Sequence, residues 1–218
     1  MSRTALVAGH TGLVGRQLIA ALVLDPRYAS VKAVGRRAPD VSHPKLEFVQ
    51  TELAELRRVQ DRLGADDAYC CLGTTLRAAG SKTAFERVDY HMVVDFARAA
   101  CEAGARRFYL VSSLSASPRS PLYYSRVKGR TEQAVIEVGF DTVHILRPSL
   151  LLGARQEHRP GEAIAQKLAP LVNLLLSGPL RRYRAVPAEE VAQALLSLSS
   201  RDTTGPHVHT LPLEAEAA

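Results

Sequence analysis

Several residue types and patterns are scarce in this sequence of 218 residues. Tryptophan is absent, aromatic residues make up 6%, and the three cysteines show no Cys-x-x-Cys spacing. Such cysteine usage argues against a disulfide scaffold and against a zinc site. The apolar stretch at residues 171–176 is interrupted by Asn173 and is too short to span a bilayer. No secretory leader precedes the first apolar segment, so we expect a cytoplasmic protein without a membrane partner.

Positive charge is present, but it is not concentrated in one place. The net charge is +6, and 23 of the 28 basic residues are arginines spread along the chain, with the densest group at residues 181–184. A nucleic-acid surface typically shows a basic stripe interleaved with aromatic residues. We therefore expect no nucleic-acid partner, because the arginines better suit a small anionic ligand or a solvated surface.

Short β-branched segments alternate with helical stretches along the chain. The expected strands are 6–8, 31–34, 46–49, 68–72, 108–111, 142–146 and 207–210, and the expected helices are 13–24, 82–102, 121–138, 161–176 and 188–199. This alternation predicts an α/β fold, a doubly wound parallel Rossmann-type sheet with flanking helices. We expect a single domain over residues 1–218, in which residues 153–218 contribute a small cap on the substrate side.

The junction between the first expected strand and the first expected helix is rich in glycine. Gly9, Gly12 and Gly15 are spaced at i, i+3 and i+6. A turn at this place must be tight, let the backbone approach a pyrophosphate, and direct helix N–H groups at its negative charge. A glycine-rich turn without a ligand is the alternative. The position of the motif favours a dinucleotide-binding site.

The end of the second expected strand carries basic residues. A fold of this kind that prefers NAD usually offers an acidic residue there to the adenosine ribose, whereas this chain has Arg36 and Arg37. Two guanidinium groups suit a 2′-phosphate. The alternative is a solvated surface pair. We therefore expect NADP(H) as the preferred cofactor, with NAD(H) as the second possibility.

Tyr124 and Lys128 are four residues apart and share one face of an expected helix. Ser113 ends the fifth expected strand, where side chains face the crevice at the carboxyl edge of a parallel sheet. A lysine ammonium lowers the pKa of a nearby phenol, so that tyrosine can exchange a proton near neutral pH. The serine hydroxyl would hold the substrate oxygen, and Ser112 is the alternative serine. The alternative is that Tyr124 and Lys128 form an ordinary surface pair and that the serine caps the end of the strand.

These motifs together resemble the atypical short-chain dehydrogenase/reductase superfamily, in particular the subgroup of the Tat-interacting oxidoreductase. The resemblance runs from about Ala5 to Ala194 and includes the segments 70–75, 112–113, 147–148 and 155–162. It implies cofactor contacts from Thr11, Gly12, Leu13, Val14, Arg36, Arg37, Leu72, Gly73, Tyr124, Lys128, Leu151 and Arg159. Arg159 could instead pair with Glu157 or Glu162 as a loop clamp.

Two features leave alternatives open. Dehydrogenases of this superfamily often place an asparagine in the long helix to complete a proton relay, whereas the matching stretch here holds Asp89 and His91. Either could replace the asparagine, although helix packing is the favoured interpretation. His207 and His209 face the same side of a short strand, but no third ligand is near them in the sequence, so we expect no metal site.

The leading hypothesis is an NADP(H)-dependent oxidoreductase that transfers a hydride to or from a small carbonyl or alcohol. Its catalytic residues would be Ser113, Tyr124 and Lys128. One alternative is an enzyme related to nucleotide-sugar epimerases or dehydratases, which share the tyrosine and lysine chemistry. Another is a non-catalytic protein that senses NADPH. The substrate cannot be read from the pattern, and a homodimer formed through helix 122–138 is compatible with the superfamily.

Overall fold

A parallel sheet organises the part of the chain that the computed structural model describes, residues 2–152 and 183–213. Seven strands follow the order β3-β2-β1-β4-β5-β6-β9, and every neighbouring pair is parallel. The strands are β1 (Arg3–Ala8), β2 (Tyr28–Gly35), β3 (Leu46–Gln50), β4 (Asp67–Cys70), β5 (Arg107–Val111), β6 (Thr142–Arg147) and β9 (Gly205–Thr210). The predicted α/β fold with a doubly wound parallel sheet is confirmed.

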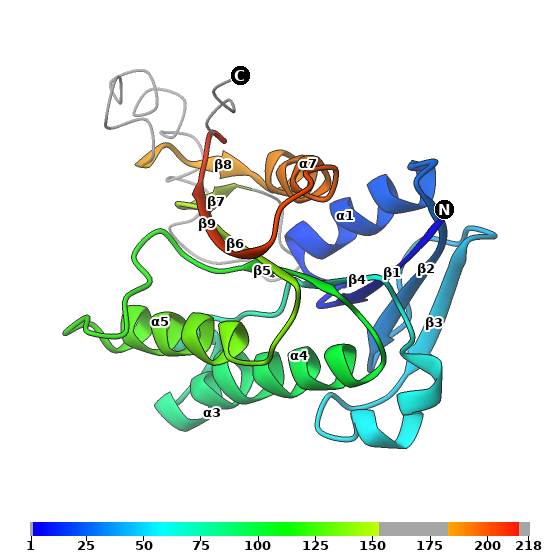
Figure 1. The fold of residues 1–218 in the computed structure, drawn as a ribbon. Coiled ribbons are helices and arrows are strands. Elements are labelled where there is room, and N and C mark those ends of the chain that lie inside the picture. Colours follow the sequence, from blue (N-terminus) through cyan, green and yellow to red (C-terminus); the bar gives the residue numbers. More distant parts are fainter. Residues whose placement is uncertain (1, 153–182, 214–218) are drawn as a thin grey trace.

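Helices cover both faces of this sheet (Figure 1). On one face lie α1 (Leu13–Leu24) and α7 (Ala188–Leu198). On the other lie α3 (Lys82–Glu86), η2 (Arg87–His91), α4 (Met92–Glu102) and α5 (Tyr123–Ile136). Shorter elements are η1 (Leu56–Arg62), α2 (Leu76–Ala79), β7 (Leu151–Leu152) and β8 (Val186–Pro187), of which β7 and β8 form a separate two-stranded sheet.

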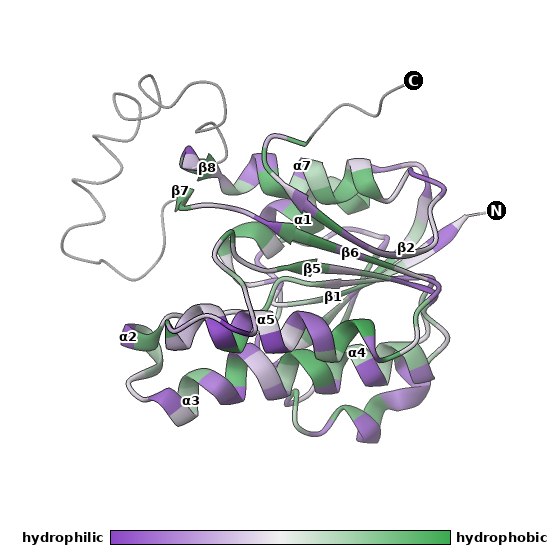
Figure 2. Cartoon of the chain, turned by 60° about the vertical axis from the view of Figure 1, so that its left-hand side comes forward, coloured by the Kyte–Doolittle hydropathy of each residue, from purple (hydrophilic) through white to green (hydrophobic). Residues whose placement is uncertain are grey.

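Two hydrophobic cores form, one on each face of the sheet. Alternate residues of β1 supply them: Ala5 and Val7 pack with α1 and α7, whereas Leu6 and Ala8 pack with α4. All four are fully buried, because side chains along a strand point alternately to opposite faces and helices cover both. Figure 2 shows the same layering, with apolar strands between helices whose outer faces are hydrophilic.

The expected long helix at 82–102 differs from a regular α-helix in its middle. It runs as α3, then the π-helical turn η2, then α4. A π-helical turn shifts the register of the side chains that follow it, and such turns are frequent at functional sites. The apolar spacing of the sequence does not reveal this turn, which carries Asp89 into contact with α5.

The region beyond β7 is described only in part. The expected helix at 161–176 and Arg159 lie outside the described residues. Within them, α7 packs against α1 in one core, and β9 pairs with β6 in the main sheet. The expectation that residues 153–218 form a small substrate-side cap on a single domain therefore stays a prediction.

A row of rings crosses the sheet on the side of α1 and α7. Tyr69, Tyr109, His144 and His207 are register partners on four consecutive strands. The rings of Tyr69 and Tyr109 are stacked with centroids 4.6 Å apart, and His144 lies 5.3 Å from Tyr109 and 5.3 Å from His207. His209 joins the end of the row, with its Nε2 2.9 Å from Nδ1 of His144. Among the described residues, no group of histidine, cysteine and acidic side chains is arranged to hold a metal ion.

Candidate cofactor and catalytic site

Several of the predicted site residues follow strands at the carboxyl edge of the sheet. The strand order reverses between β1 and β4, which are neighbours in the sheet but lead into connections on opposite sides. Open α/β sheets bind ligands in the crevice at such a reversal. The glycine turn follows β1 there, the segment with Leu72 and Gly73 follows β4, and Ser112 and Ser113 follow β5.

The three glycines of the turn differ in what a Cβ at each position would contact. Gly9 has a φ of +80°, and a Cβ there would lie 2.5 Å from the carbonyl carbon of Cys71, so the turn packs directly on the end of β4. At Gly15 a Cβ would lie 2.2 Å from the carbonyl oxygen of Gly9. At Gly12 the nearest atom to a Cβ is that same oxygen at 3.3 Å. Close backbone contacts thus require glycine at Gly9 and Gly15, whereas at the exposed Gly12 a Cβ would make a tight but wider contact with the carbonyl oxygen of Gly9.

The first turn of α1 suits an anion. Gly12 is the N-cap of this helix, no side chain caps it, and no acidic residue occupies its first turn. Free N–H groups at a helix start attract negative charge. Thr11 and Leu13 are half-buried, and Val14 is buried in the core beside α7. A dinucleotide would therefore meet the backbone of these residues, so the residues present fit a pyrophosphate group.

The two arginines after β2 are exposed on the same edge of the sheet. The side chain of Arg36 is 72% exposed, and its Nε lies 3.9 Å from a carboxylate oxygen of Glu52. An exposed ion pair at that distance contributes little and leaves the guanidinium available to a ligand. The backbone of Arg37 is held by His10, which lies in the glycine turn.

A buried ion pair lies beneath Gly73. Lys128 Nζ is 2.8 Å from Oδ1 of Asp89, and the second carboxylate oxygen accepts the N–H of Thr74 at 2.9 Å. Burial by itself lowers the pKa of Lys128, but the charge of Asp89 outweighs it together with Tyr124, so the pKa lies above its ordinary value. Lys128 is therefore a charged ammonium. A Cβ on Gly73 would lie 3.4 Å from both partners, so the loop after β4 closes over the pair.

Asp89 makes contacts that the sequence does not predict. Its carboxylate contacts Lys128 and the backbone of Thr74, and its carbonyl oxygen accepts the hydroxyl of Thr131 at 2.7 Å. The available signal is its position in the stretch where the superfamily places a relay asparagine. His91, the other residue weighed there, is exposed.

Tyr124 stands one helical turn before Lys128 on α5. Its ring is half-buried and packs against Phe85 with centroids 5.4 Å apart. A chain of hydroxyls leads from the next residue toward β5: Ser125 Oγ donates to Ser115 Oγ at 2.9 Å, and Ser113 Oγ lies 3.4 Å from Ser115 Oγ. This chain connects the strand end that holds Ser113 with the helix that holds Tyr124.

The neighbouring serine, Ser112, has a different partner. It is buried, and its hydroxyl donates to Oε1 of Glu132 at 2.5 Å. Glu132 in turn accepts two hydrogen bonds from the guanidinium of Arg147 at the end of β6. Buried charged groups require such partners. Ser112 thus belongs to a packing network between β5, β6 and α5, whereas the half-buried Ser113 lies near Ser115 and stays the predicted catalytic serine.

Two further predicted cofactor contacts pack against different hydrophobic cores. Leu72 is half-buried and packs against the core on the α4 side, and Leu151 lies in β7, half-buried against the other core. Their contacts with the cofactor stay predictions, as does that of Arg159, which lies outside the described residues.

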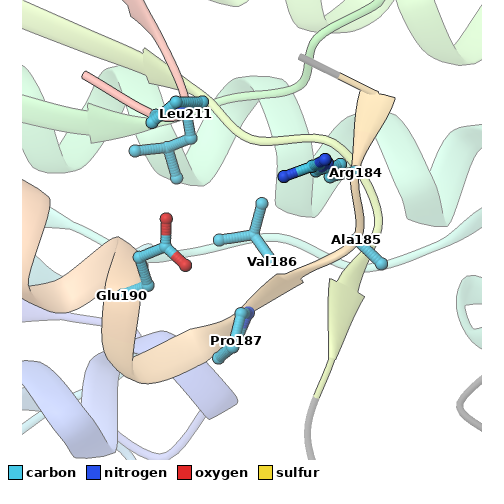
Figure 3. A pocket seen from close by; sticks show the side chains of 7 residues that line it. Arg184, Ala185, Val186, Pro187, Glu190 and Leu211 are labelled. Carbon is cyan, nitrogen blue, oxygen red and sulfur yellow. The ribbon is translucent and has the colours of Figure 1, made fainter. Parts of the chain in front are cut away.

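A separate hollow of about 260 Å³ lies between β8, the start of α7 and the segment after β9 (Figure 3). Its lining residues are Arg184, Ala185, Val186, Pro187, Glu190, Leu211 and Pro212. Val186 and Glu190 point into this space in Figure 3. Neither the glycine turn nor Tyr124 lines it, so we assign it no part in the chemistry described below.

Comparison with known proteins agrees with this geometry. A family model described as NAD(P)H-binding matches residues 9–200. The chain is 33% identical over 205 residues to "Protein FMP52, mitochondrial" of Debaryomyces hansenii, covering 92% of this chain and 89% of the relative. It is 33% identical over 201 residues to "Protein HTATIP2" of Rattus norvegicus, covering 90% of this chain and 81% of the relative. The similarity therefore extends over nearly the whole chain.

Solved structures show the same fold at low identity. MoeE5 in complex with UDP-glucuronic acid and NAD has a TM-score of 0.73 at 20% identity, covering 94% of this chain and 75% of that one. A UDP-N-acetylglucosamine 4-epimerase from Methanobrevibacter ruminantium has a TM-score of 0.71 at 16% identity, covering 96% of this chain and 77% of that one. At this level of identity, the likeness establishes the Rossmann-like architecture.

The expectation of a cytoplasmic protein is wrong. The relatives from Debaryomyces hansenii and Meyerozyma guilliermondii, the latter 35% identical over 213 residues, both carry "mitochondrial" in their names. These names place the two relatives in mitochondria and thereby contradict the expectation. The expectation rested on the lack of a secretory leader, and mitochondrial import uses signals of a different composition. No helix among the described residues is long and apolar enough to cross a membrane.

The glycine turn, the buried lysine beside a half-buried tyrosine, and the similarity to FMP52 and HTATIP2 over most of the sequence lead to one assignment. The chain belongs to the NAD(P)H-binding family, and its relatives include FMP52 and HTATIP2 proteins.

Proposed function

We propose that the protein is an NADP(H)-dependent oxidoreductase that acts on a small carbonyl compound or alcohol. The observation that carries the proposal is the placement of the buried Lys128–Asp89 pair and the half-buried Tyr124 at the same sheet edge as the glycine turn. A site that only bound a dinucleotide would not need a lysine ammonium next to a tyrosine. The nicotinamide would supply the hydride chemistry when bound.

The residues of the chain have distinct roles in this proposal. Tyr124 donates a proton to the substrate oxygen as a carbonyl is reduced, and accepts it in the reverse direction. The Lys128 ammonium stabilises the negative charge that forms on the phenol oxygen when the proton leaves. Ser113 donates a hydrogen bond to the same substrate oxygen. Asp89 is a positioning residue, because it holds the ammonium of Lys128 and the backbone of the loop at Thr74.

The preference for NADP(H) rests on the exposed arginines after β2. Arg36 and Arg37 offer two guanidinium groups where an acidic residue would favour the ribose hydroxyls of NAD(H). Charge-assisted hydrogen bonds of this kind discriminate strongly for a phosphate group. Neither arginine is needed by the hydrophobic cores, so their replacement changes cofactor affinity without unfolding the protein.

The experiment that tests the cofactor is a titration of the purified protein with NADPH and with NADH, followed by nicotinamide fluorescence and by Tm. A ligand that binds only the folded state raises Tm with its occupancy. We expect tighter binding of NADPH, and a loss of about tenfold or more in that preference when Arg36 and Arg37 are both replaced by alanine. An unchanged NADPH affinity in the double variant contradicts the assignment.

The catalytic assignment needs a separate experiment. With a panel of small aldehydes and ketones, Tyr124→Phe should still bind NADPH but lose turnover by at least about 100-fold, because the variant has no proton to donate. Turnover that survives this change would remove Tyr124 from its role. NADPH binding without turnover in the wild type would instead support a protein that senses the cofactor.

A nucleotide-sugar enzyme is the second candidate, favoured by the solved structures of similar fold. MoeE5 holds UDP-glucuronic acid and NAD, and another neighbour is a UDP-N-acetylglucosamine 4-epimerase. Both carry the fold in longer chains, of which this chain covers 75% and 77%. Addition of UDP-glucose to the NADPH-loaded protein distinguishes the candidates, since only this second one predicts a further rise in Tm.

A further inference from the structure

His10 is a buried polar residue inside the glycine turn. It occupies the position directly after Gly9, and only 3% of its surface is exposed. A buried imidazole requires a hydrogen-bond partner, and a turn that only had to approach a pyrophosphate would be served by a small residue here. The histidine therefore has a function of its own in this turn.

The contacts of His10 lead away from the turn to the segment that carries the arginines. Its Nε2 lies 2.8 Å from the carbonyl oxygen of Arg37. Because a carbonyl oxygen only accepts, Nε2 carries the proton and donates. The ring lies edge-on to Phe48 of β3, with centroids 5.8 Å apart. At Gly35 a Cβ would lie 3.1 Å from Cε1 of His10, so a glycine at the end of β2 makes room for the ring.

A second contact joins the same two segments. Arg16, in the first turns of α1, donates from Nε to the carbonyl oxygen of Thr11 at 2.9 Å. Its Nη2 also lies 3.0 Å from a carboxylate oxygen of Asp40. His10 and Arg16 thus hold the segment 37–40 to the glycine turn at both of its ends. The Arg16–Asp40 pair is more exposed, so His10 is the stronger of the two connections.

The charge state of His10 suits this role. Burial lowers its pKa, and the positive charge of Arg37 lowers it further, against opposing hydrogen bonds and Asp40. The imidazole is therefore neutral at neutral pH. It adds no charge to the site, so its influence on a bound nucleotide acts through the position of the backbone.

We infer that His10 is a positioning residue that determines cofactor choice, because it holds the backbone of Arg37 at a set distance from the pyrophosphate turn. This inference rests on the proposed preference for NADP(H). The pyrophosphate and the 2′-phosphate of one NADP(H) molecule are joined through the adenosine ribose, so contacts to both at once require that the glycine turn and the Arg37 segment keep their separation. NAD(H) lacks the 2′-phosphate, so its binding does not depend on this separation.

The test compares two substitutions by their affinities for NADPH and NADH. His10→Leu keeps the size of the side chain and removes the donor, whereas His10→Gln keeps an N–H group near the position of Nε2. We expect H10L to lose about tenfold in NADPH affinity and less than about twofold in NADH affinity, the loss of roughly one hydrogen bond. H10Q should return the ratio of the two affinities to within about twofold of the wild type.

The outcomes separate this inference from the proposed function. A wild type that prefers NADPH, with an unchanged affinity ratio in H10L, overturns the role of His10 alone. A wild type without preference for NADPH contradicts the proposed cofactor and the role of His10 together. Tm without cofactor is measured for each variant. If H10L does not fold, His10→Ala, which removes the donor without the bulk of leucine, takes its place with the same two outcomes.

Discussion

At the scale of single residues, identical residue types serve the fold in one position and the site in another. Gly9 and Gly15 are required by close backbone contacts within the turn, whereas a side chain at Gly12 would meet only one atom, at 3.3 Å. Ser112 is bound to the buried Glu132, whereas Ser113 is half-exposed near Ser115. Substituting each member of such a pair separates effects on stability from effects on binding.

The glycines give the first prediction. Gly9→Ala should lower the stability of the fold by at least about 2 kcal/mol, because its positive φ and the contact at 2.5 Å both oppose a Cβ. Gly12→Ala should lower Tm less than Gly9→Ala, because its Cβ would meet the carbonyl oxygen of Gly9 only at 3.3 Å. It should lose NADPH binding, because that Cβ would occupy the approach of the pyrophosphate. Thermal melts with and without NADPH check both; a G12A variant that binds normally would contradict the phosphate role of the turn.

The serines give a second prediction. Ser112→Ala leaves a carboxylate oxygen of Glu132 without its hydroxyl donor and should cost about 1–3 kcal/mol of stability. Ser113→Ala should leave Tm unchanged and reduce kcat/KM on a carbonyl substrate by about 100-fold, because one donor to the reacting oxygen is lost. Urea denaturation and steady-state kinetics of both variants are the measurements. Equal kinetic losses in the two variants would count against Ser113.

At the scale of elements, the π-helical turn η2 has the largest effect on the site. It lies between α3 and α4 and contacts α5, and its residue Asp89 reaches both Lys128 of α5 and Thr74 of the loop after β4. One short element thus connects three parts of the chain that are distant in sequence. A regular helix over 82–102 would place the side chains after this turn in a different register.

Asp89→Asn tests this connection. The change leaves the buried ammonium of Lys128 without its carboxylate, so stability should fall by about 3–5 kcal/mol at neutral pH. Because the folded-state pKa of Lys128 is raised, the wild-type contribution is present below the ordinary lysine value of 10.5 and is lost at higher pH. Denaturant titrations at neutral and alkaline pH check this. Asp95→Asn on the exposed side of α4 is the control and should be neutral; a similarly small effect of D89N would contradict the pairing.

At the scale of the whole molecule, the sequence predicts the sheet and most of its helices because their signals are local. Helix 13–24 has apolar residues at helical spacing and agrees with α1, and strand 142–146 is a short apolar run within β6. The contacts of His10 are not local, since they depend on Gly35 and Phe48 from two other strands. The contacts of Asp89 are not local either, because its partners lie in other elements.

The row of rings across the sheet predicts sensitivity to acid. Burial lowers the pKa of His144 to about 3 and that of His209 to about 4, and neighbouring positive charges add to both effects. Both histidines have an ordinary value of 6.5, so the unfolded chain takes up protons first and stability falls as the pH drops from about 6.5 toward 4. His144 alone should contribute a loss of about 2 kcal/mol at about pH 5.

The measurement is Tm at neutral pH and at about pH 5 for the wild type and for His144→Phe. Phenylalanine keeps a flat ring beside Tyr109 and takes up no proton. The Tm of the wild type should therefore fall more than that of the variant over this range. Equal losses would show that the carboxylates alone cause the acid sensitivity.

The same row makes the folded state visible to spectroscopy. Tyr69 and Tyr109 stack at 4.6 Å with an angle of 16° between their planes, deep in a protein without tryptophan. Two chromophores held so closely in a chiral interior couple their electronic transitions, so near-ultraviolet circular dichroism reports the packing of the central strands. Because the protein has no indole emission, the fluorescence of a bound nicotinamide can be followed beside this signal. Folding and ligand occupancy can then be measured independently in one sample.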